Sequence, residues 1–542
     1  GLGTEKSPYL ITTPSQLKTV TDSINGGADK YRSAYIRLGA DLDLRGITLD
    51  PIGGQTTYFE GVFDGAGHTV SDFRLNGETG VIGFFGYIAE ATVKNLSIAT
   101  DLSVEASDTE RNYIIGPVVA YAISGDIMIC TYRGTLRVRS SLTGSNVVYA
   151  GGICGFAQGY GSDYTAAVSY CRVEGTVSSD GTAAVTGLGG IAGMLLGTSD
   201  AGTAYVHNSV FNGTLSGVSE KTGGIVGYLR ERSSVANCYT AGTIDVRNGN
   251  GIAAAGALIG TAENETAVMS SASVMRISAV GASTEGKDVG DLVGITLAPA
   301  SVSIDARRTV LKNAYLAKDG SVNVAGTVYD LTKRADLTSL LGWHAADWQG
   351  DGATIAPDVR GADTADFTVR FVFGTDVTRP GPDGTDLTQS EDPVRATGYV
   401  PIYWAYGGNG MNTFKADNGH ISYGYFFDEA HTERIPASML LTGDMTVYVG
   451  FADYSGLVGE YYAVIEDKTV KDKRYEVKLT FDDNGKLEMY VEGMLANYVY
   501  VYDGQKILIR DGYFAYLAYS SYARKYDLDL DYYAIPTDGG LT

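Results

Sequence analysis

Three side chains that could do chemistry stand close together in the stretch FEGVFDGAGHTVSDF: Asp64, His68 and Asp72. A carboxylate beside a histidine can act as an acid/base pair or contribute ligands to a metal ion. The same stretch carries Gly65 and Gly67 in an Asp-Gly-x-Gly pattern, which is typical of a tight turn before a strand. We therefore interpret the stretch as a structural turn and assign no catalytic or metal-binding role to it.

Cysteine is the second candidate for chemistry. Cys130, Cys171 and Cys238 each come directly after a position that recurs along the chain and is described below. Cys154 lies in the motif GICG. No CxxC motif is present, so a zinc site is not expected. Because small apolar residues fill the equivalent positions elsewhere, we predict buried, inert thiols, with a reactive or disulfide-bonded pair as the alternative.

Acidic clusters are the third candidate, because glycoside hydrolases and polysaccharide lyases use carboxylates or a calcium-assisted base. Two clusters alternate with leucine, as expected of strands with one solvated face: Asp41 and Asp43, and Asp527, Asp529 and Asp531. A third has the composition of a loose calcium site but not EF-hand spacing: Asp383, Asp386, Glu391 and Asp392. The sequence therefore predicts no catalytic residue, no metal and no cofactor.

The composition limits the kinds of molecule that the protein is expected to bind. The 542 residues carry a formal charge of −22, and this acidity disfavours nucleic acid and anionic membranes as partners. The apolar runs are too short to span a bilayer, so no direct membrane insertion is expected. The chain is long enough for two to four domains, and its 71 glycines and 38 tyrosines favour an all-β protein.

A glycine-anchored apolar motif recurs along the first half of the chain. Clear copies end at Gly86, Gly155, Gly193 and Gly227, and degenerate copies end at Ala120, Gly260 and Gly294. The intervals between successive copies are 34, 35, 38, 34, 33 and 34 residues. A period of this kind is the signature of a repeat architecture, in which stacked units bury a continuous core.

A second repeated element follows each anchor. It contains an asparagine in one fixed position, at Asn95, Asn208, Asn237 and Asn313, and Tyr170 takes that place in one copy. Asparagine tolerates left-handed backbone and satisfies neighbouring backbone groups at corners. We therefore predict a ladder of corner residues along the repeats.

The repeats are glycine-rich, β-branched and short, and they show no sustained helical period. The sequence thus predicts an all-β fold whose main part is a right-handed parallel β-helix. Thr13, Pro14 and Gln16 predict the start of a helix that covers the first coil, with Thr13 as the N-cap. The segment LTKRADLTSLLGWHAADW predicts a cap after the last repeat.

These motifs carry a resemblance to a known group of proteins. The N-terminal stretches YLITTPSQLKTVTDSIN, FEGVFDGAGHTVSDFRL and GFFGYI, with the later GGIxG copies, resemble bacterial surface proteins with GLUG-type repeats. The resemblance covers about residues 8–350 and implies an exported β-helical protein. GLUG repeats also accompany a zinc protease in some immunoglobulin-cleaving enzymes, but the chain contains no HExxH motif, so that activity is not implied.

The remainder of the chain has a different character. The ending GYFFDEAHTERIPASMLLTGDMTVYVGF resembles the Listeria–Bacteroides repeat, a β-grasp-like module of surface proteins such as internalins, whereas the preceding segment departs from the usual pattern. The last part is similar to lipocalin-like domains of exported proteins. We divide the chain into a capped β-helix (1–348), a linker (349–365), the β-grasp-like module (366–453) and a small antiparallel barrel or sandwich (454–542).

Tyrosine is concentrated in the C-terminal third, and this suggests an aromatic binding face at Tyr513, Tyr516, Tyr519 and Tyr522, with half-buried strand residues as the plainer explanation. From the repeats and the resemblance we predict a non-enzymatic, monomeric, extracellular or cell-surface adhesin-like protein that binds a host protein or glycan. The alternatives are a carbohydrate-active β-helix enzyme or polysaccharide-binding protein, and a structural spacer.

Overall fold

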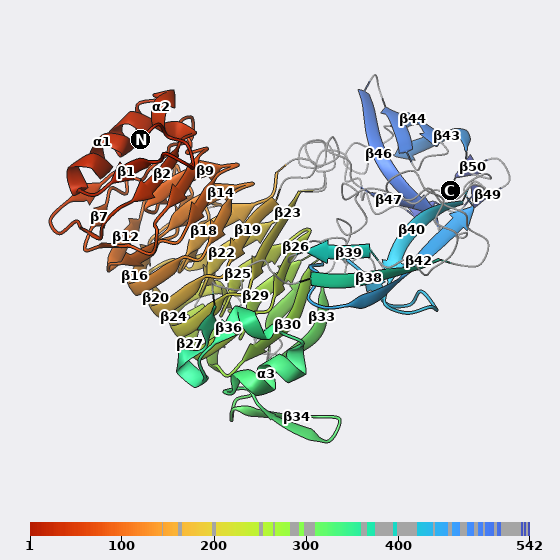
Figure 1. Ribbon diagram of the computed structural model, residues 1–542. Coiled ribbons are helices and arrows are strands. Elements are labelled where there is room, and N and C mark those ends of the chain that lie inside the picture. Colours follow the sequence, from red (N-terminus) through yellow and green to blue (C-terminus); the bar gives the residue numbers. More distant parts are fainter. Residues whose placement is uncertain are drawn as a thin grey trace.

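The computed structural model shows a long β-solenoid followed by smaller β-sheets (Figure 1). It describes residues 1–542 except 144, 161–164, 198–201, 249–252, 264–265, 282–291, 298–308, 359–365, 374–393, 398–419, 437–438, 454–457, 467–473, 482–485, 492–493, 503–506, 511–532, 535, 538–539 and 542. Among the described residues, the solenoid contains a 24-stranded sheet whose pairings are parallel and a second sheet of seven parallel strands. The prediction of a parallel β-helix followed by small β domains is confirmed.

The strands of successive coils stack into four walls, which we number in the order in which the chain passes through them. The first wall contains β1 (Tyr9–Ile11), β2 (Tyr35–Leu38), β5 (Val62–Asp64), β10 (Thr92–Lys94), β15 (Asp126–Met128), β19 (Thr165–Ser169), β23 (Thr203–His207), β26 (Ser233–Ala236), β30 (Ala267–Ser273) and β33 (Val310–Leu316). The second contains β3 (Leu42–Asp43), β6 (Thr69–Ser71), β11 (Ser97–Ala99), β12 (Leu102–Ala106), β16 (Thr131–Ser140), β20 (Arg172–Gly181), β24 (Val210–Gly223), β27 (Tyr239–Asn248) and β31 (Arg276–Gly281).

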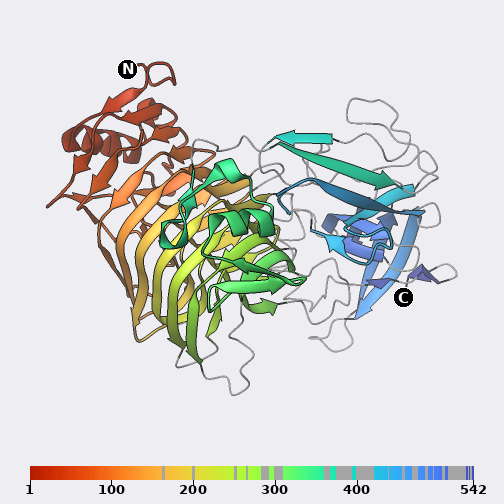
Figure 2. The ribbon, with the colours of Figure 1, turned by 60° about the horizontal axis from the view of Figure 1, so that its bottom comes forward.

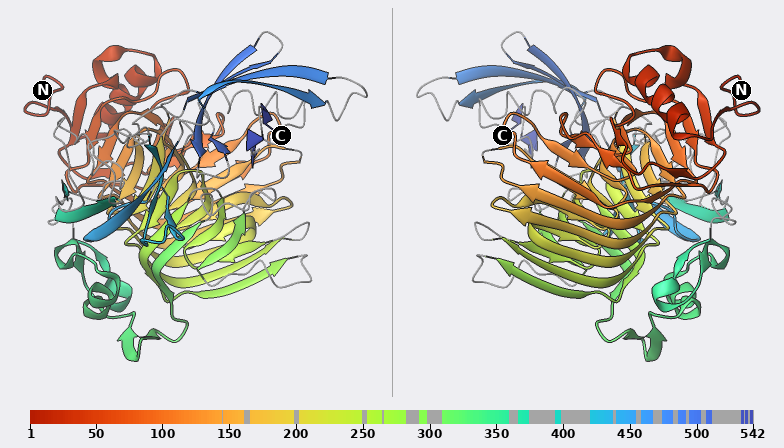
Figure 3. Two further views of the ribbon diagram at one scale, coloured as in Figure 1. Left: turned by 90° about the vertical axis from the view of Figure 1, so that its right-hand side faces the viewer. Right: turned by 90° about the vertical axis from the view of Figure 1, so that its left-hand side faces the viewer.

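The third wall contains β8 (Val81–Ile82), β13 (Tyr113–Ile115), β17 (Val148–Gly151), β21 (Val185–Gly189), the end of β24 and β28 (Ala254–Gly256). The fourth wall is the separate seven-stranded sheet, with β9 (Phe85–Ala89), β14 (Val119–Ile123), β18 (Cys154–Gln158), β22 (Ala192–Leu196), β25 (Val226–Arg230), β29 (Ile259–Glu263) and β32 (Val293–Leu297). Figure 3 shows these strands stacked in layers along the solenoid. A short parallel pair, β4 (Thr48–Leu49) and β7 (Arg74–Leu75), lies beside the first coils.

A helix covers the N-terminal end of the solenoid. Helix α1 (Pro14–Asn25) begins at the N-cap Thr13, whose side chain accepts from the backbone of Gln16, and the Gln16 side chain accepts from the backbone of Thr13 in return. This capping box and the proline at the first turn confirm the prediction. The helix buries Leu17 and Ile24 in the solenoid core, so the apolar surface of the first coil is covered. A short helix, α2 (Asp29–Arg32), follows.

The anchor glycines lie at a sharp corner between the third and fourth walls. A Cβ added to Gly193 would lie 2.6 Å from the Ala150 nitrogen and 2.6 Å from the Gly155 oxygen, and one added to Gly227 would lie 2.6 Å from the Leu188 nitrogen. The two residues before each anchor from Gly86 to Gly260 both belong to the buried core, for example Ile191 and Ala192. The chain therefore bends inward here, and the backbones of the two walls come closer together than a side chain at the anchor position would allow.

A second corner, between the first and second walls, is a ladder of left-handed residues. The four predicted asparagines have positive φ, between 48° and 55°, and the same position holds Ile129, Tyr170 and Ser270 in the other coils, also with positive φ. Left-handed backbone costs less for asparagine than for other residues with a side chain. The isoleucine and tyrosine at this corner show that the coil imposes the conformation where the residue does not favour it.

After the last coil the chain turns back and packs along the outer face of the second wall (Figure 2). This segment contains the hairpin β34 (Ser321–Val324) and β35 (Thr327–Asp330), helix α3 (Arg334–Leu341), and the pair β36 (Trp348–Gln349) and β37 (Ala356–Pro357). Two stacked tryptophans, Trp343 and Trp348, are buried in one cluster with Tyr239 of the second wall and with Ala272 at the end of β30. We call residues 343–358 the strap.

The next sheet has the strand order β39 (Val394–Thr397), β38 (Asp366–Phe373), β42 (Met445–Asp453), β40 (His420–Phe426) and β41 (Arg434–Ile435). Its central pair, β38 and β42, is parallel and its outer pairs are antiparallel, and the sheet lies within the segment 366–453 that we predicted as the β-grasp-like module. One face packs on the first wall, where Val369 and Leu440 share a cluster with Tyr205 and Met269. Lys312 Nζ lies 3.3 Å from the centre of the Phe427 ring at the same junction.

The last sheet is an antiparallel meander of β43 (Gly459–Glu466), β44 (Arg474–Phe481), β45 (Lys486–Val491), β46 (Met494–Tyr502), β47 (Ile507–Arg510) and β48 (Tyr533–Ala534). Val477, Phe481 and Leu487 are buried on it. A final pair, β49 (Pro536–Thr537) and β50 (Gly540–Leu541), is also antiparallel.

The close backbone approach at the anchor corner gives a first prediction. Gly193→Ala should lower the free energy of unfolding by about 1–3 kcal/mol, because the new methyl group overlaps backbone atoms that the stacked coils hold in place. The matched control is Gly77→Ala, where the new Cβ meets only the Ile82 side chain at 3.5 Å. Chemical denaturation measures both, and equal stability of the two variants would contradict the role assigned to the corner.

Candidate functional site

The stretch that contains Asp64 is a turn at the start of the corner ladder. The Asp64 carboxylate is buried and accepts from the Ala66 backbone at 2.9 Å, from Asn95 Nδ2 at 3.0 Å and from the Tyr35 hydroxyl at 3.4 Å. A Cβ on Gly65 would lie 2.4 Å from the Asn95 oxygen. The carboxylate thus caps the ladder and satisfies donors of three different segments, as a structural residue does.

His68 and Asp72 have other partners. His68 Nδ1 lies 3.0 Å from Asp41 Oδ1, which also accepts from the Thr69 backbone at 2.9 Å, and these two contacts hold the pKa of Asp41 below its ordinary value, with the backbone donor as the larger cause. Asp72 Oδ2 pairs with Arg45 at 3.3 Å. The three residues are therefore engaged separately, and no acid/base pair forms between them.

The four cysteines are buried and free of disulfides, and their side chains face the solenoid core. Burial raises the pKa of the Cys154 and Cys238 thiols to about 12 and raises that of Cys171 as well. A thiol acts as a nucleophile only as the thiolate. The predicted burial of the four thiols is confirmed, and their inertness stays a prediction.

The other chemistry-bearing clusters contribute no site. Asp41 and Asp43 flank the buried Leu42 and stay exposed, as a strand with one solvated face requires. The clusters at 383–392 and 527–531, and the predicted aromatic face of Tyr513, Tyr516, Tyr519 and Tyr522, lie outside the described residues. Within the described part of the chain, no group of three His, Cys, Asp or Glu side chains could hold a metal ion, and no helix is long and apolar enough to cross a membrane.

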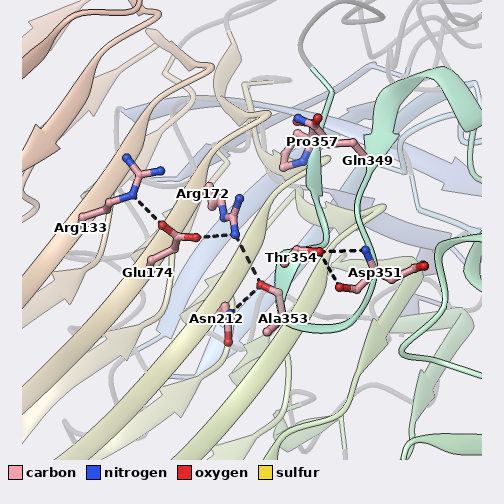
Figure 4. Close-up of polar contacts among 9 residues, drawn as sticks. All are labelled: Arg133, Arg172, Glu174, Asn212, Gln349, Asp351, Ala353, Thr354 and Pro357. Carbon is pink, nitrogen blue, oxygen red and sulfur yellow. Dashed lines mark hydrogen bonds and ion pairs between the residues drawn. The ribbon is translucent and has the colours of Figure 1, made fainter.

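Polar contacts fasten the strap to the second wall (Figure 4). The Ala353 oxygen accepts from Asn212 Nδ2 at 3.0 Å and from Arg172 Nη2 at 3.5 Å. Arg172 is held by Glu174, which also pairs with Arg133 at 2.6 Å. Deeper in the strap, the buried Asp347 carboxylate accepts from Asn208 Nδ2 at 3.2 Å. These groups pair with one another between the strap and the wall, as structural residues do.

An outward-facing row of large side chains on the fourth wall is the best candidate for function. Consecutive coils place one such residue in register beside the next, and we call this set the aromatic row: Tyr87, Tyr121, Phe156, Met194 and Tyr228. The Tyr121 and Phe156 rings are stacked with their centres 4.7 Å apart, and those of Tyr87 and Tyr121 are 5.5 Å apart. All four aromatic side chains are partly exposed.

The inward bend at the anchor glycines explains why these rings gather. Because of the bend, the outer faces of the third and fourth walls meet, and Ile114 and Ala120 form a cluster with the row that is separate from the main core. Tyr149 of the third wall approaches Phe156 at 5.9 Å between ring centres, and Lys221 Nζ lies 4.9 Å from the centre of the Tyr228 ring.

A second set of residues, two positions later on each strand, borders the row on the fourth wall. We call it the rim: Ile123, Gln158, Leu196, Arg230 and Glu263. The Tyr121 hydroxyl bonds to Gln158 Oε1 at 2.5 Å, and the Tyr228 hydroxyl bonds to the Glu263 carboxylate. Burial raises the pKa of the Tyr149 and Tyr228 hydroxyls above that of ordinary tyrosine, so both stay protonated and keep a donor for hydrogen bonding.

The aromatic row was missed in the sequence analysis, although a signal was present. The residue directly after the anchor is aromatic in four of the seven copies, as in Gly86-Tyr87 and Gly227-Tyr228. The rule of alternation along a strand does not say whether this residue points to solvent, because the bend at the anchor interrupts the alternation.

Comparisons with known proteins give limited matches. The chain matches no protein-family model. A protein of Evansella cellulosilytica described as a "Putative Gly-rich membrane protein" is 37% identical over 110 residues, which are 20% of this chain and 13% of that protein. The chain therefore corresponds to a small part of this relative.

Among solved structures, the chain is similar to a protein of Bacteroides ovatus described as a "putative immunoglobulin A1 protease". The likeness covers 66% of this chain and 94% of that protein, with 19% sequence identity and a TM-score of 0.42.

The turn at Asp64 gives a second prediction. Gly65→Ala should lower the free energy of unfolding by about 1–3 kcal/mol because its methyl group meets the Asn95 carbonyl. His68→Ala should change it by less than about 0.5 kcal/mol, since His68 has one polar contact at an exposed site. Thermal and urea unfolding compare the two variants, and a larger loss for His68→Ala would refute the structural interpretation.

The buried thiols give a third prediction. At pH 8, a thiol with a pKa of about 12 is thiolate in roughly one molecule in ten thousand, and burial excludes reagents as well. Ellman's reagent should therefore label none of the four cysteines in the folded protein and all four in guanidinium chloride. Rapid labelling of a cysteine in the folded protein would show that a thiol is accessible.

Proposed function

We propose that this chain is part of a bacterial surface or secreted protein and that its solenoid binds an extracellular ligand, a host protein or a glycan, through the aromatic row. The observation that carries the proposal is the row itself: aromatic side chains in register on the outer face of a wall, at half-buried positions. Contiguous apolar patches on a protein surface mark binding sites more often than isolated apolar residues do.

The physical properties of the row suit adhesion. Tyrosine and phenylalanine offer large contact areas and lose little conformational entropy on binding, because few of their bonds rotate. The row is also held in place by the backbone pairing of the fourth wall, so a ligand meets a preformed surface. The β-grasp-like module and the terminal sheet are then accessory units attached to this scaffold.

The relatives support an extracellular setting. The relative from Evansella cellulosilytica is described as a membrane protein, and GLUG-type and Listeria–Bacteroides-type repeats, which the chain resembles, belong to bacterial surface proteins. These likenesses support a surface or secreted protein and say nothing of its ligand.

A carbohydrate-active enzyme is the second candidate, and the groups near the row favour binding over catalysis. Glu263 and Glu231 both pair with Arg230, at 3.1 and 3.2 Å, so neither is held ready as a free acid or base. A tyrosine that removes a proton needs a lowered pKa, whereas burial raises the pKa of Tyr149 and Tyr228. Release of reducing ends or unsaturated sugars from a polysaccharide panel would overturn the non-enzymatic proposal.

The proposal gives a fourth prediction. On arrays of host proteins and glycans, Tyr87→Ser should weaken binding of the full chain about tenfold or more, because truncation of an aromatic contact of the row removes buried area. Tyr462→Ser is the matched control, since Tyr462 is 70% exposed and lies on β43, away from the row.

Thermal unfolding of both variants separates lost contacts from lost structure. The proposal requires that Tyr87→Ser remain folded at the assay temperature and bind less tightly. Ligands that bind both variants and the unsubstituted chain equally well would show that the row is not the binding surface.

A further inference from the structure

The two halves of the corner between the third and fourth walls differ in polarity. At the Tyr87 end, the row is bordered by Val81 and Ile114, which are buried against it. At the Tyr228 end, it is bordered by Arg230 and Glu263 of the rim. A ligand that lies along the row therefore meets apolar surface and hydrogen-bonding groups in succession.

At the polar end, two cationic side chains are paired with three carboxylates, so these groups carry no surplus of positive charge. Arg230 pairs with Glu263 and Glu231, and Lys221 pairs with Glu220 at 3.1 Å. Among the described residues at this end, the charges therefore do not attract an anion, and the net charge of −22 on the chain repels anionic ligands further. Charge complementarity thus favours an uncharged ligand.

The row also has a repeat along the solenoid. Five consecutive coils supply one member each, and of these Met194 is buried whereas the four aromatic members are partly exposed. The ring centres of the stacked members are 4.7 and 5.5 Å apart, and the distance from Tyr87 to Tyr228 is about 19 Å for four steps of ~4.8 Å. A linear polymer offers matching contacts at every step, whereas a compact molecule uses one or two. Sugar residues have apolar ring faces and hydroxyl groups, which suit aromatic side chains beside amide, guanidinium and carboxylate groups.

We propose that the aromatic row and the rim bind an uncharged linear glycan that lies parallel to the solenoid axis. This rests on the proposed function and names its ligand class. The aromatic side chains contact the apolar ring faces and edges, and Gln158, Arg230 and Glu263 exchange hydrogen bonds with the hydroxyl groups.

Isothermal titration calorimetry on the full chain tests this proposal. The probes are neutral oligosaccharides of increasing length, from gluco-, manno- and xylo-series, and uronic acid oligomers of the same lengths. Affinity should rise with the length of at least one neutral series until the row is filled, and it should change little with salt because no ion pairs form with the ligand. Failure of every neutral series to bind would overturn the proposal.

Gln158→Ala is the decisive variant, because it removes a rim amide, and with it the partner of the Tyr121 hydroxyl, without truncating any side chain of the row. It should weaken binding of the neutral glycan about tenfold, as expected for lost hydrogen bonds at the ligand. The matched control is Arg133→Met on the outer face of the second wall, which should bind as the unsubstituted chain does.

The two proposals fail in different ways. Binding of a host protein, or of uronic acid oligomers with a steep salt dependence, that is lost in Tyr87→Ser would refute the neutral glycan and leave the aromatic row as the binding surface. Neutral-glycan binding that is unchanged in both Tyr87→Ser and Gln158→Ala would refute both proposals.

Discussion

The arrangement of this protein depends on one close contact between backbones. At the anchor positions the fourth wall approaches the third so closely that a Cβ on Gly193 or Gly227 would stand within 2.6 Å of a backbone nitrogen. This contact lets two consecutive residues of each coil enter the core, as Ile225 and Val226 do. The coil then has an inward corner in place of a convex one, and the outer faces of two walls meet.

The corner between the first and second walls holds the later parts of the chain in place. Its left-handed residues begin at Asn95, which donates to the buried Asp64, and Asn208 donates to the buried Asp347 of the strap. Ser270 is the meeting point of three parts, because its oxygen accepts from Trp343 at 2.6 Å and its hydroxyl lies 3.2 Å from Thr442 of the β-grasp-like module. Strap and module therefore use the ladder that stacks the coils.

The same architecture separates structural chemistry from the surface proposed for binding. The groups that first suggest a site, such as Asp64 and Cys171, are engaged at corners or buried in the core. The aromatic row, in contrast, lies at the inward corner, where a bend required for packing leaves large side chains half exposed. The packing constraint and the surface proposed for binding thus have the same origin.

The sequence alone determined the repeat, the β-helix and the capping of α1, because glycine, asparagine and the Thr13–Gln16 pair act through local backbone geometry. It did not predict that Tyr87 and Tyr121 stack, nor that the strap and the module pack on the walls. Those contacts join residues 30 to about 200 positions apart, and the direction of each side chain depends on the bend at the anchor. These contacts are set only when the coils pair and fold, because the register of the walls brings these residues together.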